Sequence, residues 1–242
     1  MINLNNTQFF YDPYPHALFK DIFDTKFYHQ LCIDFPDDAK FERHDYDKQN
    51  NLKQLKFSLN DKHELFKDII NKKESLKKLY NYLCRQKFKD DIFEVLNKNS
   101  IKLQKYNSPS FFQKIYNKIN YNKKFGFEFS MISSDGGFIR PHTDGSDKIV
   151  SFVLPIVEDQ TISEIPNSGT KILKATDDKF KYNLLNSTVP FENTEIVREV
   201  PFSSNQIFLF VKTHNSLHSV GPMKNLNGKT FMRKSINFFI YR

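Results

Sequence analysis

The residues best suited to chemistry are a histidine and an aspartate two positions apart, His142 and Asp144. In an extended chain, residues i and i+2 point to the same side, so this imidazole and this carboxylate converge. A third donor can come from a histidine in the segment after a predicted buried strand over 207–211, which holds His214 and His218. Two imidazoles and one carboxylate on one face, with three positions left open, form the ligand set with which non-haem Fe(II) enzymes activate oxygen. The spacing therefore predicts a metal site.

A second pair with i, i+2 spacing, Arg233 and Ser235, lies on a strongly apolar predicted strand over 230–241. A guanidinium that points into a barrel needs an anion, and a carboxylate that accepts two parallel hydrogen bonds is its natural partner. Ser235 can donate one more hydrogen bond to that anion. The alternative is that Arg233 pairs with a buried acid of the protein itself.

Three motifs follow one another along the chain: H-x-D at 142–144, a distal histidine before Ser219-Val220-Gly221-Pro222, and R-x-S at 233–235. In this order they resemble the Fe(II)- and 2-oxoglutarate-dependent dioxygenases, in particular the prolyl-4-hydroxylase-like branch. The resemblance covers about 125–242. It implies that His142, Asp144 and His218 are the catalytic ligands of one Fe(II), and that Arg233 and Ser235 bind the co-substrate 2-oxoglutarate.

The resemblance also implies an activity: hydroxylation of an unactivated C–H bond by O2, with release of succinate and CO2. The substrate is expected to be a small molecule or a peptide. The resemblance further decides between the two distal histidines, which lie four positions apart and share a face in an extended segment. His218 precedes the Ser-Val-x-Pro context of the family, whereas His214 lies in a polar stretch typical of a turn, so we expect His218 to be the ligand.

These residues must be positioned by two parts of the chain that differ in the periodicity of their apolar residues. Residues 1–124 show mainly helical stripes, with a possible cap at Asp24, a stop at Pro36, a second cap at Asn60 or Asp61, and a last stripe over 111–119. After 124, short extended runs are predicted at 125–132, 148–156, 170–174, 195–200, 206–211 and 230–241. Short strands separated by turns are typical of a jelly roll.

We therefore expect an α+β fold in a single domain, 1–242. Residues 1–124 would be a helical support region, and 125–242 a cupin-like jelly roll, the double-stranded β-helix that the resemblance implies. The long stretch over 158–195 is a candidate lid or substrate-selecting insert.

Composition argues against several other classes of protein. The net charge is +8, but 30 of the 36 basic residues are Lys, and seven of these lie over 98–124 without an acid. We interpret that strip as a solvated face, and nucleic-acid binding as unlikely. No stretch reaches the ~20 apolar residues of a membrane helix. Cys32 and Cys84 are too few for a disulfide framework, so we expect buried free thiols and a cytoplasmic location.

Two other functions stay open at this point. Oxidative demethylation of nucleic-acid bases uses the same fold, but the final strand, with Arg233-Lys234-Ser235-Ile236-Asn237, does not match the motif of those enzymes. A non-enzymatic cupin-like module would bind a metal or a ligand and would produce no succinate. The oligomeric state is not predicted.

Overall fold

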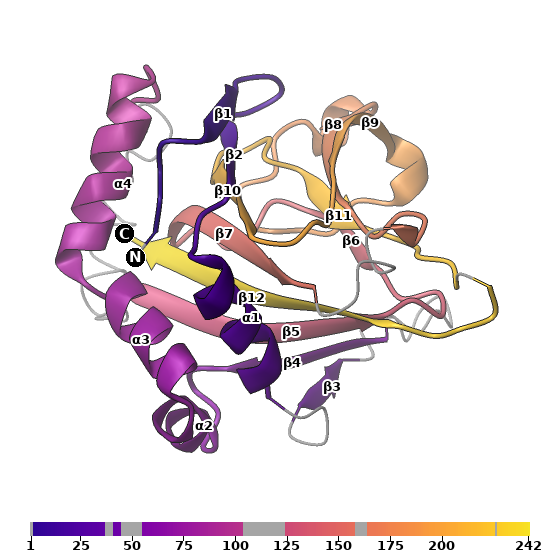
Figure 1. Ribbon diagram of the computed structural model, residues 1–242. Helices are drawn as coiled ribbons and strands as arrows, with labels where there is room; N and C mark the ends of the chain where they lie inside the picture. The colour runs from indigo at the N-terminus through magenta and orange to yellow at the C-terminus, as the bar shows by residue number, and fades with distance from the viewer. Residues whose placement is uncertain (1, 37–40, 45–54, 104–123, 158–163, 226) are drawn as a thin grey trace.

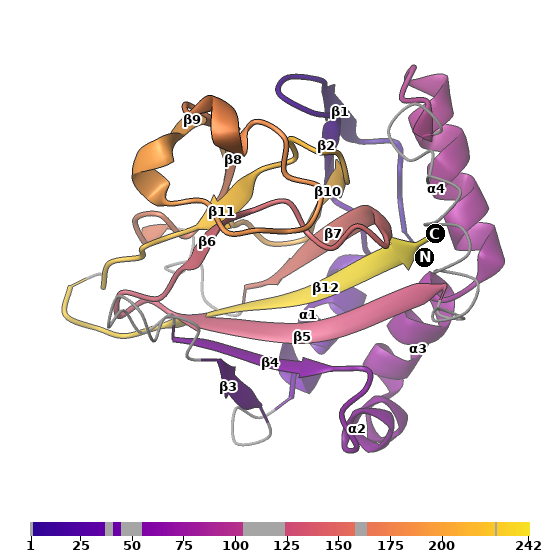
Figure 2. The ribbon, with the colours of Figure 1, turned by 180° about the vertical axis from the view of Figure 1, so that it is seen from behind.

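The computed structural model describes residues 2–36, 41–44, 55–103, 124–157, 164–225 and 227–242. Its strands form two antiparallel sheets that face each other (Figures 1 and 2). The large sheet has eight strands in the order β1-β2-β10-β7-β12-β5-β4-β3, and the small sheet has four in the order β6-β11-β8-β9. Of the helices in the described part of the chain, none has the length and hydropathy that crossing a membrane requires.

The strands of the large sheet are β1 (Thr7–Phe10), β2 (His16–Lys20), β3 (Glu42–His44), β4 (Lys56–Asn60), β5 (Phe125–Ser133), β7 (Lys148–Ile156), β10 (Gln206–Val211) and β12 (Met232–Tyr241). Those of the small sheet are β6 (Ile139–His142), β8 (Thr170–Ala175), β9 (Thr194–Val200) and β11 (His218–Val220). The helices are α1 (Thr25–Asp34), α2 (Phe66–Lys72), α3 (Glu74–Leu83) and α4 (Gln86–Lys98), with two 3₁₀ turns at Asp178–Phe180 and Phe191–Asn193.

From β5 onward the chain moves back and forth between the two sheets. Strands β5, β7, β10 and β12 belong to the large sheet, whereas β6, β8, β9 and β11 belong to the small one. This alternation is the double-stranded β-helix, so the expected α+β fold with a jelly-roll core is confirmed. Strand β12 is central, because it pairs with β5 on one side and β7 on the other.

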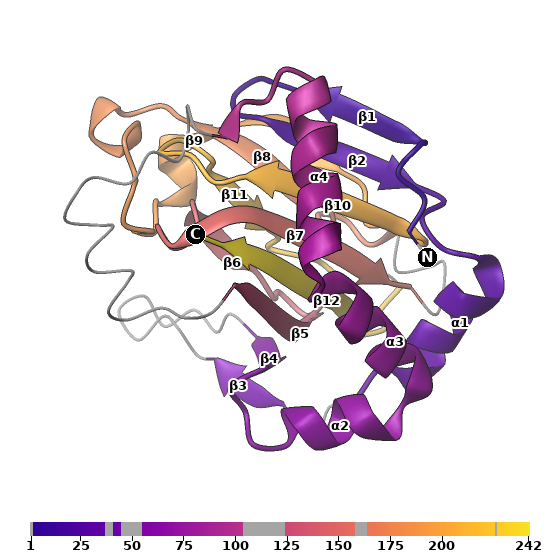
Figure 3. The ribbon, with the colours of Figure 1, turned by 90° about the vertical axis from the view of Figure 1, so that its left-hand side faces the viewer.

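The four helices cover the outer face of the large sheet (Figure 3). They bury their apolar stripes against the outward side chains of the strands; for example, the ring of Phe88 in α4 lies 5.8 Å from those of Phe152 and Phe238. Helix α1 starts where the sequence predicts, because Asp24 Oδ1 accepts hydrogen bonds from the backbone amides of Lys26 and Phe27. The opposite face of β12 is thereby left to the interior between the sheets.

Several details differ from expectation. Strands β1 to β4 lie in the half that shows helical stripes, and they extend the large sheet at both edges. Helix α2 begins at Phe66 without a side-chain cap, since Asn60 ends β4 and Asp61 accepts a hydrogen bond from the amide of Phe127. The stripe over 111–119 and most of the lysine strip lie outside the described residues. Neither cysteine forms a disulfide; Cys32 is buried and Cys84 half-buried.

Candidate functional site

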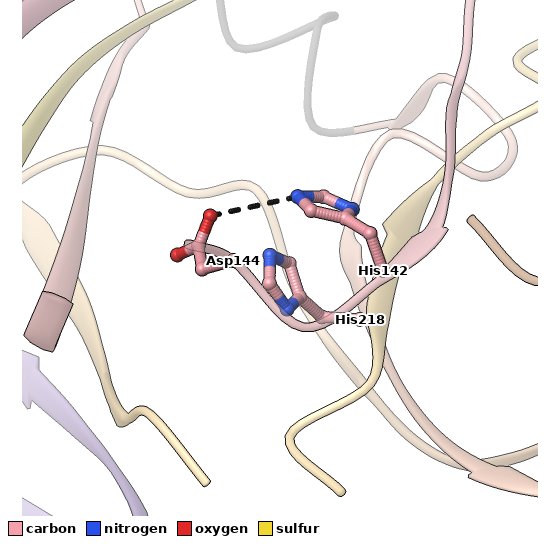
Figure 4. A group of neighbouring side chains, drawn as sticks. All are labelled: His142, Asp144 and His218. Atoms are coloured by element: carbon pink, nitrogen blue, oxygen red, sulfur yellow. Dashed lines mark ion pairs between the residues drawn. The ribbon is translucent and has the colours of Figure 1, made fainter. Parts of the chain in front are cut away.

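The structure brings His142, Asp144 and His218 together at one end of the small sheet. Strands β6 and β11 are antiparallel neighbours, and their register places His142 directly opposite His218. The two imidazole centroids are 4.2 Å apart. Asp144 follows β6 with φ of 69°, and its Oδ1 lies 3.6 Å from His142 Nε2 (Figure 4). One ligand atom from each residue lies within 4.8 Å of the others, the spacing of a metal site.

Both histidines are held in the orientation that a metal ligand needs. His142 Nδ1 lies 2.8 Å from the carbonyl oxygen of Arg140, and His218 Nδ1 lies 3.0 Å from that of Ser216. A carbonyl only accepts, so each Nδ1 donates, and Nε2 is the atom that each ring offers to a metal. Burial, with a smaller effect of His142, lowers the pKa of His218 to about 3, so its imidazole is neutral near pH 7.

The Asp144 carboxylate is fixed by two donors from β7. Ser151 Oγ donates to Oδ2 at 2.6 Å, and Lys148 Nζ donates to Oδ1 at 2.9 Å. Burial alone would raise the pKa of Asp144, but Lys148 and the two histidines outweigh it, so the pKa lies well below its usual value. Asp144 is therefore ionised, and the site presents two imidazoles and one carboxylate.

The three residues share a cavity of about 130 Å³ with Arg233 and Ser235, which β12 contributes from the facing sheet. Arg233 is only 3% exposed. Its Nε donates to the carbonyl of Ser168 at 2.6 Å, its Nη2 donates to Thr170 Oγ1 at 3.3 Å, and its guanidinium lies over the Phe202 ring. Burial lowers the pKa of Arg233 to about 9. No carboxylate of the described residues forms an ion pair with it, so the alternative of an internal acid finds no partner there.

Other polar side chains on the cavity wall were not indicated by the sequence. Ser219 Oγ is buried without a hydrogen-bond partner among the described residues, at a point where the pairing of β11 with β6 shifts register. Asn237 Nδ2 donates to Glu128 Oε1 at 3.1 Å, and Lys56 Nζ lies 3.5 Å from the same oxygen. Only the i, i+2 alternation of β12 could have pointed to Asn237, two positions after Ser235.

His214 lies apart from the metal group. It is exposed, and its ring stacks on Tyr182 with the centroids 4.9 Å apart. Its carbonyl accepts a hydrogen bond from the backbone amide of Asn183. Asn183 belongs to the stretch over 158–195, and the part of that stretch around it packs behind the H-x-D turn.

Behind the turn lies a buried polar cluster. Thr143 Oγ1 donates to the carbonyl of Asn183 at 2.7 Å, and the buried Lys212 donates to Thr143 Oγ1 at 2.7 Å. Ser216 Oγ donates to the carbonyl of Thr143 at 3.3 Å, which ties the turn to the segment that carries His218. Burial lowers the pKa of Lys212 to about 8. The cluster thus connects the two segments that supply the candidate ligands.

Comparison with known proteins gives likenesses in structure alone. No protein-family model matches this chain, and no curated protein matches its sequence. A prolyl-4-hydroxylase from Pseudomonas putida is 13% identical, with a TM-score of 0.45 over 94% of this chain and 92% of that one. A prolyl hydroxylase from Trichoplax adhaerens, in complex with a hypoxia inducible factor peptide fragment, is 10% identical, with a TM-score of 0.49 over 93% and 83%.

A third similar structure is HygX from Streptomyces hygroscopicus, with nickel and 2-oxoglutarate bound. It is 9% identical, with a TM-score of 0.48 over 93% of this chain and 82% of that one. At such values the likeness by itself decides neither substrate nor reaction. The solved structures that are similar to this chain include prolyl hydroxylases and a 2OG-Fe(II) oxygenase family protein from Caulobacter crescentus.

Proposed function

We propose that this protein is an Fe(II)- and 2-oxoglutarate-dependent oxygenase. One observation carries the proposal: a two-histidine, one-carboxylate group shares a cavity with a buried arginine that has no acid partner among the described residues. Each half calls for a partner, because the first group is a ligand set for a metal ion and the second is a buried cation without an acid among the described residues. A dianion that chelates iron at one end and presents a carboxylate at the other completes both.

Each residue has a role in this proposal. His142, His218 and Asp144 would hold Fe(II) through their two Nε2 atoms and one carboxylate oxygen, and Arg233 would bind the distal carboxylate of 2-oxoglutarate. Bound iron would supply O2 activation, coupled to the oxidation of 2-oxoglutarate to succinate and CO2.

The protein orients these groups and keeps water out. The Nδ1 hydrogen bonds fix the two imidazoles, and Ser151 fixes the carboxylate. Phe210 and Phe239 provide apolar cavity walls. Ser235, which now donates to Asn237 Oδ1 at 3.2 Å, and the unpartnered Ser219 hydroxyl are available to the co-substrate.

The reaction we propose is hydroxylation of an unactivated C–H bond on a small molecule or a peptide. The two named prolyl hydroxylases act on prolyl groups, and one of them was solved with a peptide. The cavity lies between two sheets, and apolar side chains form part of its wall, a setting suited to a reaction that must be shielded from water.

The test starts with anaerobic Fe(II) binding. Wild type should bind about one Fe(II) per chain, and His142→Ala and Asp144→Ala should each lose most of the affinity, because a ligand is gone. His214→Ala is the matched control and should keep the metal. Unchanged iron binding in both ligand variants would defeat the assignment.

Turnover then separates an enzyme from a binding module. With iron and O2, wild type should convert 2-oxoglutarate to succinate, if slowly without its substrate. A chain that binds iron and 2-oxoglutarate but forms no succinate would be a cupin-like binding protein instead.

A further inference from the structure

One cation in the cavity lies beside the metal group but is neither a candidate ligand nor part of the arginine clamp. Lys148 is the first residue of β7, and its ammonium lies 2.9 Å from Asp144 Oδ1 and 3.5 Å from the centroid of the Phe239 ring. Its side chain is 16% exposed and lines the cavity. The ammonium thus lies beside the position at which a metal would bind.

The charges on the cavity wall can be counted. The charged residues that line it in the described chain are three cations, Lys56, Lys148 and Arg233, and two anions, Glu128 and Asp144. Lys56 pairs with Glu128 at 3.5 Å and Lys148 pairs with Asp144 at 2.9 Å, which leaves the wall with a net charge of +1. Adding Fe(II) and the 2-oxoglutarate dianion changes this sum by zero.

Binding of the two groups does change which charges are paired. The negative charge of Asp144 would be balanced by the metal, and Arg233 would pair with the distal carboxylate of 2-oxoglutarate. Lys148 would then have lost its counter-ion to a dication that repels it. A half-buried ammonium in that position needs another anion.

We propose, on the basis of the proposed function, that the substrate carries a carboxylate and that Lys148 binds it. Because Lys148 Nζ lies at hydrogen-bond distance from a candidate ligand oxygen, the anion that it holds lies next to the metal. The C–H bond that is oxidised is therefore within a few bonds of that carboxylate. The Phe239 ring keeps the ammonium facing the cavity, and Lys56 cannot replace it because Glu128 holds Lys56.

The experiment compares probes that differ in charge but hardly in shape. Anaerobic protein loaded with Fe(II) and 2-oxoglutarate is titrated calorimetrically with propionate and with propionamide. A second pair, the blocked amino acids N-acetyl-aspartate amide and N-acetyl-asparagine amide, shows whether a free acid or an acidic side chain is preferred. In each tested pair that enters the cavity, the acid should bind at least about tenfold more tightly than its amide.

Variants assign that preference to one residue. Lys148→Met should reduce the preference for the acid to nearly nothing, and Lys148→Arg should retain most of it. Lys174→Met is the matched control, since it removes the same charge from an exposed site that pairs with Asp12. Fe(II) and 2-oxoglutarate are added to saturation for each variant, because Lys148 contacts Asp144 and its replacement can change the affinity for iron. In Lys174→Met both affinities, measured before the probes are added, should remain within about threefold of wild type.

The possible failures are distinct. If wild type binds Fe(II) and 2-oxoglutarate but prefers neither acid over its amide, the carboxylate proposal is wrong and the proposed function stands. If wild type binds neither Fe(II) nor 2-oxoglutarate, the carboxylate proposal and the proposed function are both wrong. A preference that persists in Lys148→Met would assign the anion to another cation and overturn the role of Lys148.

Discussion

Replacing Arg233 by Met should leave the ligand-free protein as stable as wild type or more stable. Burial lowers the pKa of Arg233 from its ordinary value to about 9. That shift corresponds to a cost of about 5 kcal/mol for keeping the guanidinium charged. Because the folded-state pKa lies below the unfolded one, the cost is fully present below pH 9 and disappears only as the pH rises towards the ordinary pKa of an arginine.

Local contacts offset part of this cost. Two hydrogen bonds, to Ser168 and Thr170, and the contact with the Phe202 ring contribute about 1 kcal/mol each. The remaining cost is about 2 kcal/mol. The free energy of unfolding of Arg233→Met should therefore be about 2 kcal/mol higher than that of wild type. Removing one partner of a buried ion pair would instead lower the stability by about 3–5 kcal/mol.

The assay is urea unfolding of metal-loaded, anaerobic protein with and without 2-oxoglutarate. At a hundredfold excess over its dissociation constant, 2-oxoglutarate should stabilise wild type by about 2.7 kcal/mol. It should stabilise Arg233→Met by less than about 1 kcal/mol, because binding weakens by roughly 2–5 kcal/mol. Arg198→Met, at an exposed arginine that stacks on Phe10, is the control and should respond like wild type. A variant that loses 3 kcal/mol or more without ligand, or that 2-oxoglutarate stabilises as much as wild type, would refute this reasoning.

Three further predictions concern other residues. His218→Ala should abolish Fe(II) binding and turnover, whereas His214→Ala should keep the iron; the reverse result would move the ligand by four residues. The buried Lys212, with a folded-state pKa of about 8, should make wild type gain about 3 kcal/mol of stability between pH 8 and pH 10.5. Lys212→Met should lack this gain, so parallel stability curves in pH titrations of the two proteins would contradict it. DNA or RNA should bind weakly in filter-binding assays and be released at physiological salt; tight, salt-resistant binding would favour base demethylation instead.

The strands were predictable where a local signal defines them. The runs over 148–156 and 206–211 coincide with β7 and β10, because each is apolar and bounded by turn-forming residues. Strands β2 and β4 were not predictable, since they are short and their partners, β10 and β5, lie far away in the sequence. For such strands, pairing in the folded protein decides the structure and local propensity does not.

The same distinction applies to the candidate site. The i, i+2 spacing of Arg233 with Ser235 on β12 brings both onto the cavity, as expected from strand geometry. His142 and Asp144 also share that cavity, but Asp144 reaches it from a left-handed turn after β6 and not from an extended strand. Ser219 could not be predicted from such spacing, because a register shift between β6 and β11 brings it to the cavity together with the adjacent His218. Lys148 could not be predicted either, since its contact with Asp144 depends on the left-handed turn at Asp144, after which the chain enters β7.

The central position of β12 has a consequence for synthesis of the protein on the ribosome. Strands β5 and β7 are joined to each other only through β12, which is made about a hundred residues after β5, or roughly 5–20 s later at typical elongation rates. Until then the nascent chain holds two half-sheets with unpaired edges, a state in which chaperones would find exposed strands. The strand that closes this gap also carries Arg233, so the sheet and the proposed co-substrate site are completed in the same step.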